Sequence, residues 1–308
     1  MTDAKKIVCF GEILWDILPA GAVPGGAPMN VAYHLRKLGL DPGIVTRVGI
    51  DERGKKLINL LNENGVTTDH IQLDYDIPTG VVNAAANEQG EMQYDIVASA
   101  AWDFIALDDV TVELVNEASY FIFGSLVNRN PASRNTLFAL LETAQQKVLD
   151  INLRPPHFNR HLVEDLLSRA DIIKMNSAEL ELITGWFTRY KTMTDRIAII
   201  QDRFQVPRII VTMGADGAMV KIEGELYGHP GFVVDVADTI GSGDSFLAAF
   251  LFKQLNHSGP NESLAFASAL GALVASKTGG WPVYEINDIH KLAASQKAVP
   301  FNNYNYCQ

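Results

Sequence analysis

Residues 25–48 read GGAPMNVAYHLRKLGLDPGIVTRV, a helical pattern followed by a strand pattern. In Ala27–Leu38 the apolar residues recur at spacings of four and three, and Gly39 follows where a left-handed helix cap is favoured. The apolar run Ile44–Val48 has the length of a buried strand. Because another strand-like run, Ile7–Ile13, precedes the helix, this region predicts a strand–helix–strand unit.

The same alternation continues along the chain. Further strands are predicted at Tyr120–Leu126, Val148–Asn152, Ile172–Asn176 and Ile209–Met213. A helix is predicted at Pro131–Gln146, an antiparallel stretch at Ala218–Val236, and later helices from about Gly243, Asn261 and Glu285. Strands that are apolar throughout and alternate with helices are typical of a parallel sheet covered on both faces. The sequence therefore predicts an α/β fold.

Residues 79–104 interrupt this alternation with two β-like runs around Glu88-Gln89-Gly90, which predicts a hairpin. We expect residues 1–308 to form a single domain with a small β lid at about residues 12–22 and 78–104. Such a lid would cover the carboxyl ends of the strands, where open α/β sheets bind ligands. An extra edge hairpin without a role is the alternative. The apolar residues of the lid would also suit pairing with a second copy, so a homodimer through the lid is an expected option.

Composition and charge exclude several classes of protein. Acidic residues outnumber basic ones, 36 against 25, and the net charge of −11 disfavours nucleic acid as a partner. The two cysteines, Cys9 and Cys307, are too few for a disulfide framework or a four-thiolate metal site. No run approaches the roughly 20 apolar residues of a membrane helix, and the start lacks the pattern of a secretory signal. We therefore expect a cytoplasmic protein that binds neither nucleic acid nor membrane.

The clearest chemical signal is DTIGSGDSF at residues 238–246, which opens a helical run. Gly241, Ser242 and Gly243 at the first helical turn would present backbone N–H groups with no side chain in the way, which favours binding of a phosphate. Asp244 would repel an anion there, so we interpret it as the acceptor of a proton from a hydroxyl that attacks the phosphate. An ordinary first-turn carboxylate is the alternative interpretation.

A second glycine turn opens the first helix. Gly25 and Gly26 permit close approach of the backbone to a ligand, and Asn30 can both donate and accept hydrogen bonds. Asp16, near the end of the first strand, can accept hydrogen bonds from vicinal hydroxyls. A tight turn and a solvated loop aspartate are the alternatives.

Four segments, taken together, resemble the motifs of one family in the matching order over nearly the whole chain. They are GGAPMNVAYHLRKLG (25–39), NSAE (176–179), VTMGADGA (211–218) and DTIGSGDSFLAAFL (238–251). They resemble the ribokinase-like carbohydrate kinases of the phosphofructokinase B type. The resemblance implies a three-layer α/β/α fold with a mostly parallel central sheet and a small β-hairpin lid. It also implies an ATP-dependent sugar kinase.

The resemblance implies a role for each candidate residue. Asp244 would be the catalytic base, and the backbone from Ile240 to Gly243 would form the anion hole. Asn176 and Glu179 would orient Mg²⁺ and its waters. The nucleotide would lie along Thr212, Gly214, Ala215, Gly217 and Gly243. The sugar would be held by Asp16, Gly25, Gly26, Asn30 and Arg154. A K⁺ site at Asp238 and the Ile240 carbonyl, beside residues 276–280, is left open.

Two segments, GGAP (25–28) and DINLR (150–154), are similar to fructokinases and suggest which sugar is the substrate. They predict phosphorylation of D-fructose to D-fructose 6-phosphate. Arg154 can donate a fork of hydrogen bonds to sugar oxygens, but it would equally suit the carboxylate of 2-keto-3-deoxygluconate, or form a surface salt bridge. A 2-keto-3-deoxygluconate kinase, a ribokinase, and a non-catalytic regulator that binds sugar or nucleotide are therefore the alternatives.

Overall fold

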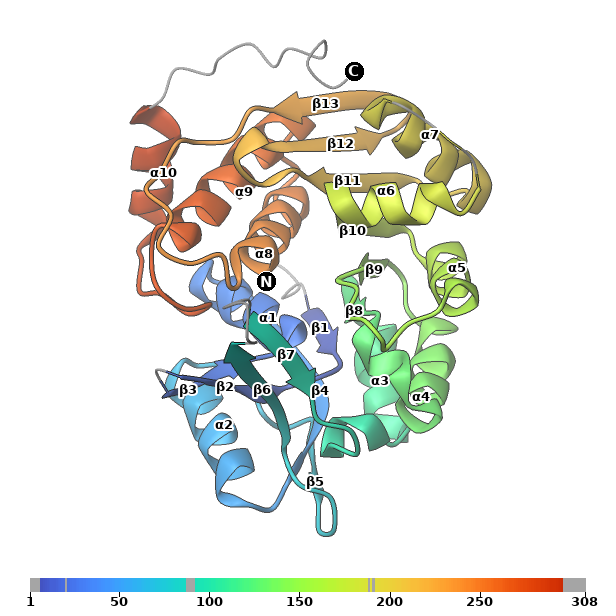
Figure 1. The fold of residues 1–308 in the computed structure, drawn as a ribbon, viewed down its shortest axis with the longest axis vertical. Helices are drawn as coiled ribbons and strands as arrows, with labels where there is room; N and C mark the ends of the chain where they lie inside the picture. Colours follow the sequence, from blue (N-terminus) through green and yellow to red (C-terminus); the bar gives the residue numbers. More distant parts are fainter. Residues whose placement is uncertain (1–5, 20, 87–91, 188, 190–191, 296–308) are drawn as a thin grey trace. The chain divides into compact units, whose positions relative to one another are not determined.

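The computed structural model describes residues 6–19, 21–86, 92–187, 189 and 192–295. The chain divides into two compact units, Met1–Gln145 and Gln146–Gln308. Both contain parallel strands alternating with helices, which confirms the predicted α/β fold (Figure 1). The expected single domain is not tested by this division and stays a prediction. Among the described residues, no helix combines the length and apolar character needed to cross a membrane.

The first unit contains parallel strands in the order β8-β1-β4-β5. These strands are β1 (Lys6–Phe10), β4 (Asp41–Gly49), β5 (Ile71–Asp74) and β8 (Tyr120–Gly124). The helices of the unit are α1 (Ala27–Lys37), α2 (Glu52–Glu63), α3 (Asp109–Asn116) and α4 (Pro131–Leu141), with short 3₁₀ turns η1 (Ala101–Phe104) and η2 (Leu126–Arg129). Helix α1 packs on β1, β4 and β8. Strand β1 is buried from Ile7 to Phe10, as its uniformly apolar sequence predicts.

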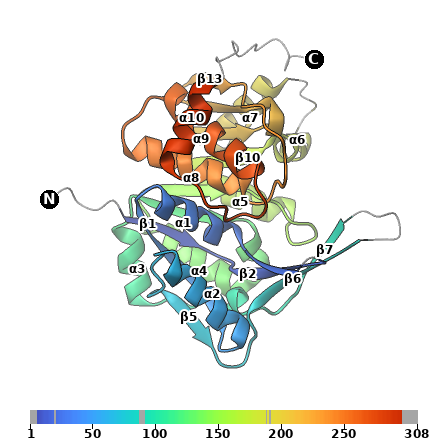
Figure 2. The ribbon, with the colours of Figure 1, turned by 90° about the vertical axis from the view of Figure 1, so that its left-hand side faces the viewer.

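A small sheet of four strands belongs to the same unit, in the order β3-β2-β6-β7. Its strands are β2 (Leu14–Leu18), β3 (Gly21–Gly25), β6 (Gly80–Ala86) and β7 (Met92–Ile96). The pairs β2–β3 and β6–β7 are antiparallel, whereas β2 and β6 are parallel. Figure 2 shows β6 and β7 extending away from the helices of the unit. The predicted hairpin is therefore present, although its predicted turn at Glu88-Gln89-Gly90 lies outside the described residues. Pairing of two copies through this sheet stays a prediction.

The start of the small sheet differs from the sequence prediction. The apolar run Ile7–Ile13 is not one strand, because β1 ends at Phe10 and the next strand begins at Leu14. Gly11 has φ +140°, a backbone conformation that L side chains rarely adopt, and a Cβ there would lie 3.0 Å from the Pro28 side chain. The chain turns at this glycine, and Asp16 lies on β2 of the small sheet rather than at the end of β1.

The second unit has strands in the order β13-β12-β11-β10-β9. Strands β9 (Lys147–Asp150), β10 (Ile172–Asn176) and β11 (Arg208–Thr212) are parallel, and β12 (Ala218–Ile222) and β13 (Glu225–His229) are antiparallel, as predicted. The helices are α5 (Arg160–Arg169), α6 (Ser177–Gly185), α7 (Met193–Phe204), α8 (Ser242–Leu255), α9 (Pro260–Ala275) and α10 (Ile286–Ser295), with a 3₁₀ turn η3 (Gly214–Asp216). Helix α9 packs on β12 and β13, whereas α6 packs on β10 and β11.

Candidate active site

Helix α8 begins as the sequence predicts, at a glycine turn that holds a carboxylate. Its N-cap, Gly241, is left-handed with φ +73° and supplies no side chain to cap the helix. A Cβ at Gly241 would lie 2.7 Å from the Cα of Gly280, so this close approach of two backbones requires glycine. Asp244 lies in the first turn of α8 and is only 9% exposed. The positive end of the helix dipole stabilises a carboxylate at this position.

A buried lysine that none of the sequence motifs includes lies against this turn. Lys174 on β10 is in register with Asp150 at the end of β9, and both side chains are buried. The Lys174 Nζ lies 3.0 and 2.9 Å from the two Asp150 carboxylate oxygens. A Cβ on Gly243 would lie 2.9 Å from the same Nζ, so the ammonium group borders the first turn of α8. The only signal in the sequence is a lone lysine inside the apolar strand IIKMN.

The charge on Lys174 is set by its neighbours. Burial acts to lower the pKa of the ammonium, but the negative charges of Asp150, Asp244 and Glu179 outweigh burial and raise the pKa above its ordinary value. Lys174 is therefore a permanent cation at physiological pH.

Asn176 and Glu179 form the N-terminal capping box of α6. The Asn176 Oδ1 accepts a hydrogen bond from the Glu179 N–H at 2.9 Å, and the Glu179 Oε2 accepts one from the Asn176 N–H at 2.8 Å. The Leu153 N–H donates to the Glu179 Oε1 at 2.8 Å. Burial raises the pKa of Glu179, with a further contribution from the Asp150 charge, against the opposing effect of these hydrogen bonds.

The residues at this capping box fit a hydrated cation. Each Glu179 oxygen accepts one backbone N–H, which leaves lone pairs for water. Among the described residues there is no group of three or more His, Cys, Asp or Glu that suits direct coordination of a metal. Mg²⁺ keeps most of its waters in proteins, so the pair fits Mg²⁺ that is held through water.

Four of the five predicted nucleotide residues lie at the end of β11 and in the turn after it, and the fifth, Gly243, lies in the first turn of α8. Gly214 and Gly217 have φ +59° and +92°, and a Cβ on Gly217 would collide with the carbonyl oxygen of His229. The Met213 N–H donates to the Gly217 carbonyl at 2.8 Å, which closes the turn. The structure thus brings Thr212, Gly214, Ala215 and Gly217 together in one tight turn between β11 and β12.

Asp238 joins two backbone segments. Its Oδ1 accepts a hydrogen bond from the Ile240 N–H at 3.0 Å, and its Oδ2 accepts one from the Gly279 N–H at 3.1 Å. The turn before α8 therefore lies beside residues 276–280, as the predicted K⁺ site requires. The carboxylate itself is used to hold this turn.

The first unit contains four of the predicted sugar-binding residues. The carboxylate of Asp16 lies so close to Gly25 that a Cβ on this glycine would collide with its Oδ2. Gly26 is the N-cap of α1 with φ +109°, and its carbonyl accepts the Asn30 N–H at 3.0 Å. Asn30 is 5% exposed. The Asp16 carboxylate therefore lies next to Gly25, and a backbone hydrogen bond joins Gly26 to Asn30.

The fifth predicted sugar-binding residue, Arg154, belongs to the second unit and is exposed. Its Nη1 donates to the Leu153 carbonyl at 3.3 Å. Within the described ranges Arg154 makes no ion pair, so the surface salt bridge considered as its alternative role is not observed there.

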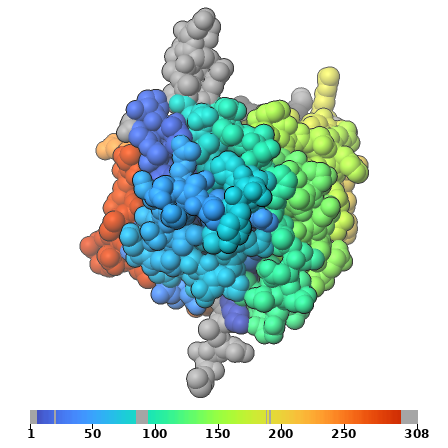
Figure 3. Space-filling view, turned by 90° about the horizontal axis from the view of Figure 1, so that it is seen from below, coloured from blue at the N-terminus to red at the C-terminus, as the bar shows by residue number. Residues whose placement is uncertain are grey.

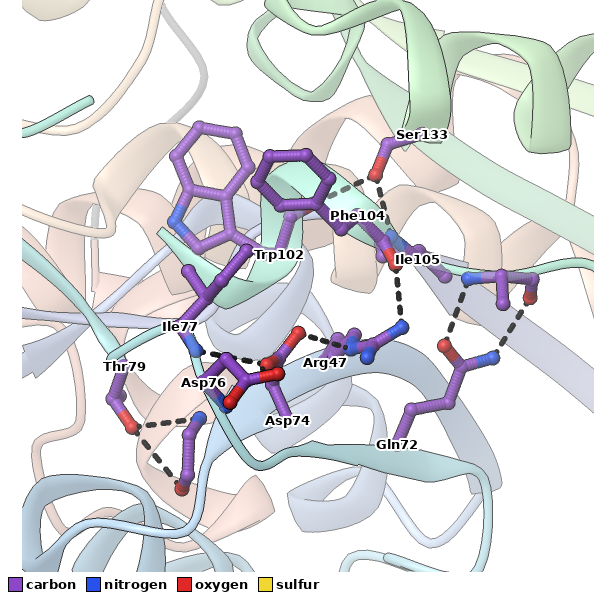
Figure 4. A network of polar contacts seen from close by, with 12 residues as sticks. Arg47, Gln72, Asp74, Asp76, Ile77, Thr79, Trp102, Phe104, Ile105 and Ser133 are labelled. Carbon is purple, nitrogen blue, oxygen red and sulfur yellow. Dashed lines mark hydrogen bonds and ion pairs between the residues drawn. The ribbon is translucent and has the colours of Figure 1, made fainter. Parts of the chain in front are cut away.

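The base of the small sheet is fixed by a polar network that the sequence motifs do not indicate (Figure 4). The Arg47 guanidinium on β4 forms a 2.7 Å ion pair with Asp74 and donates to the Phe104 carbonyl at 3.0 Å. The Asp74 carboxylate also accepts the Ile77 N–H at 2.8 Å. The Thr79 hydroxyl donates to Asp51 at 2.8 Å. These contacts tie both ends of the segment 78–104 to the rest of the first unit.

Helix α2 lies beside this region. In the space-filling view the light blue of α2 and the cyan of the segment around residues 70–80 lie side by side (Figure 3). Contact between Gly54 of α2 and the Thr79 hydroxyl agrees with this view, because a Cβ on Gly54 would lie 2.7 Å from that oxygen.

Comparison with known proteins relates both units to one family. The pfkB family of carbohydrate kinases matches residues 6–285. The fructokinase of Klebsiella pneumoniae is 29% identical over 304 residues, which are 92% of this chain and 97% of that protein. Fructokinase from Xylella fastidiosa with bound ATP has a TM-score of 0.85 and 25% identity, covering 95% and 99% of the two chains. Fructokinase from Vibrio cholerae with fructose, ADP and calcium has a TM-score of 0.80 and 22% identity, covering 94% and 99%. These matches confirm the expected fold.

Proposed function

The chain belongs to the pfkB family of carbohydrate kinases and is a phosphotransferase that acts on a sugar hydroxyl, and we propose that it phosphorylates D-fructose on the primary hydroxyl at C6. The observation that carries this proposal is the buried Asp244 in the first turn of α8, which begins at a glycine and has no side-chain cap. The relatives named fructokinase, and the GGAP and DINLR segments, support fructose as the acceptor.

In the proposed reaction, Asp244 takes the proton of the C6 hydroxyl while the oxygen attacks the γ-phosphorus of ATP. A new P–O bond forms, the bond from the γ-phosphorus to the β-phosphate oxygen breaks, and fructose 6-phosphate and ADP leave. We assign the charge that develops on the phosphoryl oxygens to the backbone from Ile240 to Gly243, where the N–H groups of Gly241 and Gly243 would stabilise it. In this structure the Ile240 N–H donates to Asp238 and the Ser242 N–H donates to the Thr239 carbonyl. The turn at Thr212, Gly214, Ala215 and Gly217 is assigned to the nucleotide.

We assign Mg²⁺ to Asn176 and Glu179, which would hold it through water. When bound, Mg²⁺ supplies positive charge to the phosphates of ATP. The turn at Asp238 and Ile240 stays a prediction for K⁺, to be tested by comparing turnover in potassium and sodium salts.

We assign the sugar to Asp16, Gly25, Gly26, Asn30 and Arg154, the residues that the sequence motifs indicate. A carboxylate and an amide match the hydroxyls of a sugar, since the first accepts hydrogen bonds and the second both donates and accepts them. The exposed Arg154 guanidinium, which makes no ion pair within the described ranges, also fits a carboxylate. For this reason 2-keto-3-deoxygluconate is retained as a second candidate substrate.

The test incubates purified protein and ATP with fructose, 2-keto-3-deoxygluconate or ribose and measures the rate at which ADP forms. We expect the highest kcat/KM with fructose. Phosphorus NMR of the product should show that it is phosphorylated at C6. A much higher kcat/KM with either other sugar would refute fructose as the substrate. Arg154→Ala discriminates further, because it should weaken turnover of the keto-deoxy acid more than that of fructose.

A further inference from the structure

Lys174 is a buried, charged residue to which the proposed reaction assigns no role. Its ammonium donates hydrogen bonds of 2.9 and 3.0 Å to Asp150 and also lies against the backbone of Gly243. Lys174 is 7% exposed and Asp150 is 3% exposed. An ion pair buried to this degree carries a large desolvation cost and is weak evidence for a role in stability alone.

The surroundings of Lys174 hold more negative than positive charge. Asp150 comes from β9, Glu179 from α6 and Asp244 from α8, and all three carboxylates interact electrostatically with the ammonium. A phosphoryl group that approaches the first turn of α8 adds further negative charge. The helix N-terminus supplies only about half an elementary charge of the opposite sign. Without Lys174, the carboxylates would repel the group that is to be transferred.

We propose that Lys174 is a positioning residue for phosphoryl transfer: anchored by Asp150 and set against Gly243, its ammonium offsets the surrounding carboxylates and lets an anionic group reach the α8 turn beside Asp244. The inference rests on the proposed function, since it concerns the same transfer step. It also explains Gly243, where any side chain would displace the ammonium.

The test must separate this role from simple pairing with Asp150. Lys174→Met alone would leave a buried, unpaired carboxylate, which is strongly destabilising and would confuse loss of fold with loss of function. The combined variant Lys174→Met/Asp150→Asn removes both charges and keeps the size of both side chains. We therefore expect it to fold, with thermal unfolding close to that of the unaltered protein.

For the folded double variant we expect kcat to fall by about 10²-fold, comparable to the loss of one donor to a developing oxyanion. The KM for the sugar should change by less than about threefold, because other residues are assigned to bind the sugar. A merely structural role would predict recovery of turnover once both charges are gone. A kcat within about threefold of the unaltered protein would therefore overturn the proposal.

A lysine–glutamate pair away from the α8 turn provides the control. Lys253 of α8 forms an ion pair with Glu262 of α9 near the other end of α8, and the Glu262 side chain is exposed. Lys253→Met/Glu262→Gln removes one charge of each sign in the same way and should leave kcat unchanged. The unaltered protein is assayed first: absence of turnover with every sugar refutes the proposed function and this inference together. Turnover that survives in Lys174→Met/Asp150→Asn refutes only the inference.

A second measurement tests the contact itself and does not depend on activity. In the unaltered protein, Gly243→Ala places a methyl group 2.9 Å from the Lys174 Nζ but 3.7 Å from its Cε. We expect this substitution to lower the unfolding temperature by about 3 °C. In the Lys174→Met/Asp150→Asn background it should have less than half that effect, because the nitrogen is gone. Equal effects in the two backgrounds would contradict the proposed packing.

Discussion

Helices α1 and α8 both begin at a glycine, but their N-termini differ in charge. Each has a glycine N-cap with positive φ, Gly26 or Gly241, and neither has a side-chain cap. The first turn of α1 has no acidic residue, whereas that of α8 contains Asp244 and is bordered by Lys174. Helix α9 also begins at a glycine without a side-chain cap, but Gly259 has a negative φ of −66°. Helices α2 to α7 are instead capped by side chains, namely those of Asp51, Asp108, Asn130, Asn159, Asn176 and Thr192.

The contrast in charge indicates which ligand each turn is suited to bind. A helix end capped by its own side chain has used part of its hydrogen-bonding capacity internally, whereas a glycine N-cap leaves that capacity for a ligand. At α1 the neutral amide of Asn30 and the nearby Asp16 suit the hydroxyls of a sugar. At α8 the carboxylate and ammonium suit transfer of a proton and of a charged phosphoryl group. Four substitutions test how far this contrast between the helix ends holds.

The largest effect is expected at Asp244. Asp244→Asn keeps the shape of the side chain but removes the proton acceptor, so kcat should fall about 10³-fold, or about 4 kcal/mol in activation free energy. ATP binding, measured by calorimetry, should stay within about threefold, because the backbone of the α8 turn is unchanged. Asp109→Asn, in the exposed first turn of α3, is the matched control and should leave kcat unaltered. Equal turnover by the two variants would remove the assignment of Asp244 as the base.

The next largest effect is expected at the N-cap of α1. Gly26→Ala combines a φ of +109° with a collision between the new Cβ and the Glu12 carbonyl oxygen. We expect the free energy of unfolding in urea to fall by about 3 kcal/mol. Gly39→Ala is the control, since Gly39 has φ +90° but a Cβ added there would meet no atom within 4 Å. A loss at Gly26 no greater than that at Gly39 would show that the close approach to Glu12 has no energetic consequence.

Much of the glycine turns at the starts of α1 and α8 can be predicted from the sequence, because neighbouring residues determine them. Glycines beside a helical run, with Asp244 following, define the α8 turn without knowledge of distant residues. The strand Ile172–Asn176 has the bounds that the sequence predicts, because its apolar run ends at the polar Asn176. The helix predicted to reach Gln146 ends at Leu141, and of residues 142–146 only Ala144 is buried.

The remaining features depend on contacts between distant segments. The pairing of Lys174 with Asp150 spans 24 residues, and its contact with Gly243 spans more. The sequence shows only a lysine in an apolar strand. The polar network around Arg47 and Asp74 is equally non-local (Figure 4). The break at Gly11 escapes sequence prediction for a different reason, because Phe10 before it and Ile13 beyond Glu12 are both apolar and suit either sheet.

The α8 N-cap should be less sensitive than that of α1. Gly241→Ala adopts φ +73°, in the left-handed region that other residues occupy at a cost of about 1–2 kcal/mol, and its Cβ would lie 2.7 Å from the Gly280 Cα. We expect the free energy of unfolding to fall by about 2 kcal/mol and kcat to fall with it, because the turn must shift. Gly224→Ala, with φ +82° and no atom within 4 Å, should show the smaller loss and unchanged kcat. If both variants lose the same stability and keep full turnover, then the contact with Gly280 does not shape the anion site.

The smallest effect is expected at a helix end that is already capped. Asp51 caps α2 by accepting the Gly54 N–H, and its other oxygen accepts the Thr79 N–H, each at 2.8 Å. Asp51→Asn keeps the cap but loses the acceptor for Thr79, so unfolding free energy at pH 7 should fall by about 1 kcal/mol with kcat unaffected. Asp108→Asn is the control, because among the described residues Asp108 accepts only the Thr111 N–H, and Asn caps helices equally well.

The pH dependence of the stability difference between Asp51→Asn and the unaltered protein identifies the cause of that difference. Burial acts to raise the pKa of Asp51, but the hydrogen bonds from Thr79 and Gly54 outweigh it and hold the pKa below its ordinary value of 3.8. A carboxylate with a lowered pKa in the folded state stabilises the protein above that ordinary value, and the stabilisation disappears as the pH falls through the lowered pKa. The gap between Asp51→Asn and the unaltered protein should therefore be constant between pH 7 and about pH 5 and close below pH 3.8. Urea unfolding at a series of pH values measures this gap, and a gap of the same size at about pH 3 would mean that the difference does not depend on the charge of Asp51.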